Sequence, residues 1–214
     1  MRASFRGRVT SKRCDNIFQR FPMRKSRAET AESRTRIVSN ASRLFLTEGI
    51  ASVGTREIMS ASGIAQGGFY RHFNSKEQLL EEAYHEILAN LFAMFEERTT
   101  GMPSHDALKT IITLYLDQSP AVSDVDLCPL AMLGSELKRT NDDVRSVALL
   151  GYERFIRLLE THLTQMDKPH PRALATAISS ALVGAVTLAS IAPHRATARQ
   201  ILKSAREYVL RDID

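Results

Sequence analysis

Residues 55–80, TREIMSASGIAQGGFYRHFNSKEQLL, contain two short segments of helical type separated by a glycine. The first segment, 55–62, has its apolar residues on one side and ends before Gly63, and glycine readily adopts the left-handed conformation common after helix ends. The second segment runs from residue 66 to 73 and carries Phe69 and Phe73 four positions apart. The stretch therefore predicts two short helices joined by a tight turn.

A longer helix follows these two, because Ser75 and Gln78 have the Ser-x-x-Gln spacing of a capping box. Apolar residues then recur at helical spacing to about residue 98. No segment alternates apolar and polar residues as a strand would, so the sequence predicts an all-α fold of about nine helices. The other predicted helices span 33–48, 104–116, 129–139, 141–166, 171–192 and 197–211.

The chain has 214 residues, 43% hydrophobic and 25% charged, a composition typical of a globular protein. Residues 1–36 hold 11 of the 29 Lys and Arg but only 3 of the 24 acidic residues. Such a basic segment favours a polyanion as partner, either nucleic acid or an acidic membrane surface. We expect a flexible arm at 1–32, with Met23 as an alternative start, a DNA-binding domain at 33–78, and a larger domain at 79–214.

Residues 173–192 are uncharged and long enough to span a membrane. They are rich in Ala and Ser, which favours a buried helix of a soluble protein, so we expect no membrane partner. Cys14 and Cys128 form neither a disulfide framework nor a metal-ligand spacing. The sequence thus predicts a cytoplasmic protein with no cofactor and no metal.

The two short helices match a helix-turn-helix unit, in which the second helix enters the DNA major groove. Gln66 would stand at the leading end of that helix, where its amide can pair with an adenine edge. Gly67 and Gly68 would let the backbone approach DNA closely, and Tyr70 would reach a phosphate. The alternative is an ordinary helical hairpin with a solvated Arg-His face, since such hairpins do not imply function.

Residues 33–80 resemble the TetR family of transcriptional regulators, whose pattern includes an aromatic-Tyr-x-His-Phe recognition helix and a Ser-Lys-Glu helix start. Family members usually carry Ser or Thr at the positions of Ala65 and Gly68, so a less rigid recognition helix with fewer side-chain contacts is expected here. The resemblance implies DNA contacts by Thr55, Arg56, Gln66, Gly68, Tyr70, His72 and Lys76. Gly67 joins them because its backbone could approach DNA closely.

Residues 128–145 are similar to a sixth-helix segment seen in one broad subgroup of the family. The family plan implies a homodimer formed by the last two helices, which carry Ala177, Ala181, Gly184, Ala185, Leu188, Ile201, Ala205 and Tyr208. Aromatic and soft side chains of the larger domain are candidates to line an effector pocket, although such residues are often only core: Phe92, Phe95, Tyr115, Cys128, Met132, Tyr152 and Phe155.

The sequence therefore predicts a dimeric transcriptional regulator, more specifically a repressor that binds a palindromic operator in double-stranded DNA. A small, largely apolar ligand would release it. One alternative is an enzyme with Cys128 as nucleophile and a histidine such as His162 as base, although no motif supports it. Another is a helical module that binds protein instead of DNA. We expect a regulator without enzymatic activity.

Overall fold

The computed structural model describes residues 27–117, 128–211 and 213, and within them the chain is all-helical. The predicted fold class is confirmed. The basic segment before residue 27, with Cys14 and Met23, lies outside the described residues. The elements in chain order are α1 (Arg27–Glu48), α2 (Thr55–Ala61), the short 3-10 helix η1 (Gln66–Arg71), α3 (Lys76–Thr99), α4 (Ser104–Asp117), α5 (Pro129–Leu137), α6 (Asp142–Gln165), α7 (Pro171–Ser190) and α8 (Arg195–Arg211).

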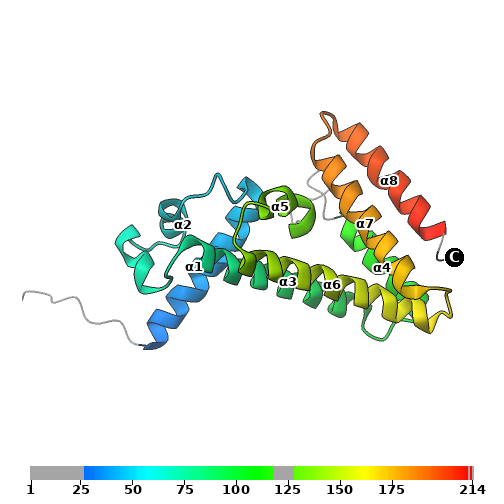
Figure 1. Cartoon of the computed structure of the whole chain (residues 1–214), viewed down its shortest axis with the longest axis horizontal. Helices are drawn as coiled ribbons and strands as arrows, with labels where there is room; N and C mark the ends of the chain where they lie inside the picture. The colour runs from blue at the N-terminus through cyan, green and yellow to red at the C-terminus, as the bar shows by residue number, and fades with distance from the viewer. Residues whose placement is uncertain (1–26, 118–127, 212, 214) are drawn as a thin grey trace, which may run out of the picture.

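Two long helices, α3 and α6, run side by side and connect the ends of the molecule (Figure 1). The helices α1, α2 and η1 form a small unit at one end, which we call the head. The hairpin of α7 and α8 lies at the other end, and α4 and α5 lie between α3 and α7 (Figure 1). We call everything after the start of α3 the body. Helix α3 begins against α1 of the head and runs through the body, so it can transmit a displacement between them.

The predicted cap of α3 is present. The Ser75 hydroxyl accepts a hydrogen bond from the Gln78 amide N–H at 3.1 Å, and the Gln78 side chain accepts one from the Asn74 N–H at 2.8 Å. At the start of α6, Asn141 similarly accepts from the Val144 N–H at 3.0 Å. These side chains satisfy donors that a helix start leaves unpaired.

Two of the differences from the predicted helix boundaries have a clear physical cause. Helix α1 starts at Arg27 instead of residue 33, because its first turns, rich in Ala and Glu, favour a helix without burying an apolar face. The recognition element is a 3-10 helix that ends at Arg71, not a helix that continues to Phe73. Two adjacent glycines disfavour a regular α-helix there, and Ala65 provides no side-chain cap.

Helix α7 is the one described helix whose length and composition would allow it to cross a membrane. It packs against both α6 and α8, and Ala175, Ile178 and Leu182 on it are buried. Packing within the chain therefore explains part of its apolar character.

Candidate nucleic-acid interface

The turn between α2 and η1 depends on Gly63, whose backbone φ of +67° lies in the left-handed region. The Gly63 N–H donates to the Ser60 carbonyl, and the Ile64 N–H donates to the Met59 carbonyl, both at 3.0 Å. Met59 and Phe69 are fully buried beneath the turn. The glycine therefore closes α2, and the buried side chains hold η1 against it.

The outer face of this pair of helices is polar. Arg56 on α2 donates from its Nε to the Gln66 side-chain oxygen on η1 at 3.1 Å, so the two predicted base-reading residues lie together. Tyr70 is 79% exposed, and Arg71 beside it is exposed too. Guanidinium, amide and phenol groups on one exposed face can pair with base edges and phosphates.

The two glycines of η1 differ in their surroundings. Gly67 is exposed, and a β-carbon there would meet nothing within 4 Å. Gly68 is buried, and a β-carbon there would lie 3.4 Å from Ile64 and 3.1 Å from the Arg71 guanidinium. This corrects the prediction that Gly68 faces a groove: it allows η1 to pack closely on α2, so its contribution to an interface is indirect.

The remaining predicted contacts lie at the edge of the face. Thr55, His72 and Lys76 are each half-buried. The Lys76 ammonium donates to the Ile50 carbonyl at 2.6 Å, which leaves two of its three N–H donors available. Arg34 of α1 binds both the His72 carbonyl and Glu82 of α3, and it thereby ties η1 to two neighbouring helices.

One residue that links body and head was missed by sequence reasoning. Glu136 of α5 accepts a hydrogen bond from the Ala51 N–H at 2.7 Å, just after α1. The other carboxylate oxygen of Glu136 lies 2.7 Å from where a β-carbon of Gly49 would be, and Gly49 has a φ of +87°. Gly49 was recognisable as a helix stop, but nothing in the sequence paired it with Glu136.

Five of the predicted effector residues form one buried cluster in the body: Phe92, Phe95, Phe155, Tyr115 and Cys128. The Phe155 ring stacks on Phe95 at 5.8 Å and on Tyr115 at 5.0 Å between centroids. Met132 and Tyr152 are half-buried against it. Of these seven residues, Phe92 and Phe95 line a described pocket, which lies between α3 and α6.

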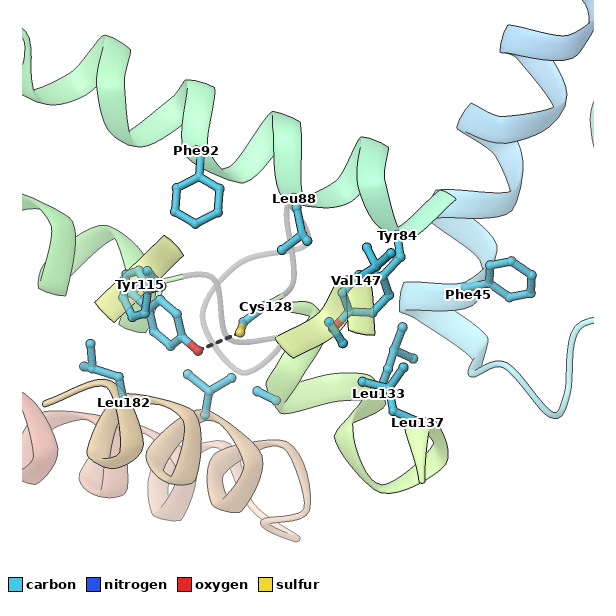
Figure 2. Close-up of a cluster of buried hydrophobic side chains, with 14 of the residues drawn as sticks. Phe45, Tyr84, Leu88, Phe92, Tyr115, Cys128, Leu133, Leu137, Val147 and Leu182 are labelled. Carbon is cyan, nitrogen blue, oxygen red and sulfur yellow. Dashed lines mark hydrogen bonds between the residues drawn. The ribbon is translucent and has the colours of Figure 1, made fainter. Parts of the chain in front are cut away.

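Cys128 is fully buried, and its sulfur lies 2.6 Å from the Tyr115 hydroxyl (Figure 2). Burial raises the pKa of the thiol, although the hydrogen bond with Tyr115 opposes this. A thiol held neutral and away from solvent is a poor nucleophile, which argues against a Cys128-dependent enzyme.

The histidine proposed as its base is also partly buried. Burial favours the neutral imidazole and therefore lowers the pKa of His162. Within the described part of the chain, no group of His, Cys, Asp and Glu is arranged to hold a metal ion.

Most of the predicted dimer residues on α7 and α8 are exposed or half-buried. Leu188 is 54% exposed and Tyr208 is 56% exposed, and the space around Gly184 is open. Ala177 is exposed, whereas Ala181, Ile201 and Ala205 are half-buried. Ala185 was predicted to lie in the dimer interface, but it is buried within the monomer. Ile191, which is 72% exposed at the end of α7, was not predicted and adds to the exposed apolar residues of this hairpin.

Two family models match the chain. Residues 37–83 match the model described as bacterial regulatory proteins, tetR family. Residues 104–203 match the C-terminal domain of LmrA/YxaF-like transcriptional regulators. The first match covers most of the head and its junction with α3, and the second covers most of the body.

Individual relatives agree with these matches. The transcriptional repressor KstR2 of Rhodococcus jostii is 33% identical over 81 residues, which are 37% of this chain and 40% of that protein. The regulator LmrA of Bacillus subtilis is 26% identical over 163 residues, 73% of this chain and 86% of that protein. The chain spans less than two thirds of the length of the first curated relatives it matches.

Solved structures extend the similarity to the whole fold. A TetR transcriptional regulator from Chloroflexus aurantiacus has a TM-score of 0.71 at 26% identity, covering 85% of this chain and 96% of that one. Reduced NemR of Escherichia coli has a TM-score of 0.74 at 20% identity, covering 83% and 95%, which supports the fold alone. The head, the body and the sequence matches agree, and the chain belongs to the TetR family of bacterial regulatory proteins.

Proposed function

We propose that this protein is a cytoplasmic transcriptional repressor that binds a palindromic operator as a homodimer and leaves it when a small molecule binds the body. The observation that carries the proposal is the exposed Arg56–Gln66 pair on the same helix-turn-helix as the exposed Tyr70. The buried side chains Met59 and Phe69 hold the two helices of this unit together. The outer face of the unit presents base-reading and phosphate-binding groups together. It favours DNA over a protein partner.

Two copies would associate through the outer surface of α7 and α8. The hairpin carries the exposed apolar side chains Leu188, Ile191 and Tyr208 together with the small residues Ala177 and Gly184, which would permit close approach of a second helix pair. A two-fold dimer presents two heads to two half-sites about one helical turn apart. Changing the separation of the heads would then weaken both contacts at once.

Signal transfer from body to head would use the two connections between them. One is α3 itself, and the other is the hydrogen bond from Ala51 to Glu136. A ligand that shifts α3 or α5 would move the head as a unit, because Arg34 also fastens η1 to α1 and α3. By linkage, DNA would weaken ligand binding by the same factor.

The test is an electrophoretic shift with the duplex upstream of the protein's own gene. We expect Arg56→Ala to weaken binding by roughly tenfold or more, since bidentate base contacts contribute about 1–3 kcal/mol. Arg98→Gln is the matched control, because Arg98 is exposed at the far end of α3. Equal affinity of both variants for the duplex would reject this reading face.

Dimerisation has its own test. Leu188→Glu should convert the protein to a monomer in light scattering, because it places a charge in the proposed interface. Leu150→Glu changes an equally exposed leucine on α6 and should leave the dimer intact. If both variants remain dimeric, another surface forms the dimer.

A further inference from the structure

A pocket of about 400 Å³ lies between α3 and α6, away from the head. Its apolar floor consists of Phe92, Phe95 and Leu158, and Phe92 and Phe95 are nearly fully buried. Polar residues form its walls: Glu96, Thr99, Thr100, Arg154, Arg157 and Thr161. A volume of this size accommodates a small organic molecule.

Arg154 supplies the first free cation of this pocket. Its guanidinium lies 4.0 Å from the centroid of the Phe92 ring, so the ring holds it by a cation–π contact. Among the residues that the structure describes, it forms no ion pair. A guanidinium fixed by a ring face keeps its N–H donors available at its edge.

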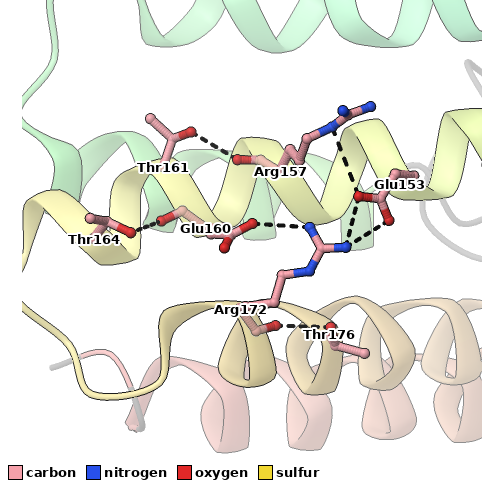
Figure 3. Close-up of polar contacts among 7 residues, drawn as sticks. All are labelled: Glu153, Arg157, Glu160, Thr161, Thr164, Arg172 and Thr176. Carbon is pink, nitrogen blue, oxygen red and sulfur yellow. Dashed lines mark hydrogen bonds and ion pairs between the residues drawn. The ribbon is translucent and has the colours of Figure 1, made fainter.

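Arg157 is the second cation of the pocket, and it is only weakly paired because Arg172 occupies the carboxylate of Glu153. Arg172 takes both carboxylate oxygens of Glu153 at 2.7 and 2.8 Å and one oxygen of Glu160 at 3.1 Å (Figure 3). Arg157 reaches Glu153 only at 4.0 Å, and its side chain extends from α6 away from α7 (Figure 3). Its side chain is 61% exposed, so most of its donors are available to a ligand.

The other wall residues restrict the ligand further. The hydroxyls of Thr99, Thr100 and Thr161 each donate to a backbone carbonyl of their own helix, so the two guanidinium groups are the main free donors. Glu96 places one negative charge in the same wall and disfavours a ligand with two negative charges. An apolar floor below two arginines suits a molecule with an apolar body and one acidic group.

We propose that this pocket binds a small amphipathic monocarboxylate, with its carboxylate on Arg154 and Arg157 and its apolar part against Leu158 and Phe92. The regulatory role of the site rests on the proposed function, because the pocket borders α3, which continues into the head. The binding chemistry itself does not depend on DNA. The two parts can therefore be tested separately.

The test is calorimetry with the full chain and no DNA, using phenylacetate as the probe. Phenylacetate should bind with a dissociation constant on the order of 0.1–1 mM, as expected for so small a ligand. Phenylacetamide, which lacks the charge, and acetate, which lacks the ring, should each bind roughly tenfold more weakly. The two compounds test the acidic and the apolar halves of the site independently.

The variant for this site is Arg154→Gln with Arg157→Gln, which should weaken phenylacetate roughly tenfold or more, while Arg98→Gln should not. Arg157→Gln alone serves if the double variant is not folded, because that side chain is largely exposed. Absence of phenylacetate binding at millimolar concentration, or equal binding by the double variant, would overturn the site. Failure of the wild type to bind its operator would instead reject the proposed function and leave this result standing.

Discussion

The two ends of α3 pack in different ways. The first turn is held by directed polar contacts: the Ser75 cap, the bond from Lys76 to Ile50, and Arg34 on Glu82. The last turns are held by apolar contact, with Phe95 packed between Phe92 and Phe155. Both ends also bury apolar side chains, such as Leu79 and Leu80 near the head, so the head end differs by its additional directed bonds. Substitutions of buried apolar side chains and of polar contacts should therefore differ in the size of their effect on stability.

The largest expected effect is Phe95→Ala, at the body end. Removing a fully buried aromatic ring leaves a cavity and should cost about 3–5 kcal/mol of unfolding free energy. Denaturant unfolding at fixed protein concentration measures it. Tyr70→Ala, in the head, removes a ring that is 79% exposed and should cost less than about 0.5 kcal/mol. A similar cost for both would contradict the difference in burial between the two rings.

Gly49→Ala should have the next largest effect, about 1–3 kcal/mol, because Gly49 has a φ of +87°. The new β-carbon would also displace Glu136, whose Oε1 would be only 2.7 Å away. Gly63→Ala also places a β-carbon at a positive φ, +67°, but that carbon meets nothing within 4 Å, so this variant is the comparison for the displacement of Glu136. If Gly49→Ala costs no more stability than Gly63→Ala, the displacement of Glu136 does not destabilise the fold.

A pH effect should appear in the body. Burial raises the pKa of Cys128, so the folded state favours the neutral thiol, and stability is lost as pH rises above the ordinary thiol pKa of about 8.5. The loss should begin near pH 8.5, and the two proteins should be compared below about pH 9.5, because ordinary tyrosines have a pKa of about 10 and add their own ionisation above that range. Stability measured across this range should fall more steeply for wild type than for Cys128→Ala. Parallel curves would show that the thiol does not contribute.

The smallest effect is expected at the head end of α3. Ser75→Ala removes the side chain that accepts the Gln78 N–H and should cost about 1 kcal/mol. Ser135→Ala, within α5, changes an exposed serine that caps no helix and should be nearly neutral. Thermal unfolding of the two variants compares them directly. A neutral Ser75→Ala would mean that Lys76 and Arg34 hold this end without the cap.

The sequence predicted most of the fold because its signals are local. Helical spacing, the Ser75 cap and the stop at Gly63 each depend on neighbours within one or two turns. The same reasoning missed the early start of α1, since residues 27–32 form a helix with little apolar periodicity. It also extended η1 by two residues, because the effect of adjacent glycines on helix type is weak in isolation.

The residues of the candidate DNA face were named from the sequence, and their contacts with DNA stay a prediction, but the arrangement within the face could not be predicted. That Arg56 bonds to Gln66, and that Gly68 faces inward, depends on how η1 lies against α2. Among the effector candidates, residue type indicated an apolar cluster. Only packing separated Phe92 and Phe95, which line a pocket, from Tyr115 and Cys128, which bond to each other in the core.

The sequence by itself determined the helices, their caps and the family, because periodicity, capping and motif spacing are properties of neighbouring residues. The tertiary structure alone decided which charges are free. Arg154 and Arg157 look no different from Arg172 in the sequence, yet Arg172 takes both glutamates and leaves the other two facing a pocket. Competition for a partner depends on distances across helices, and local sequence does not encode those distances. The same holds for Glu136, which reaches the head over 85 positions along the chain.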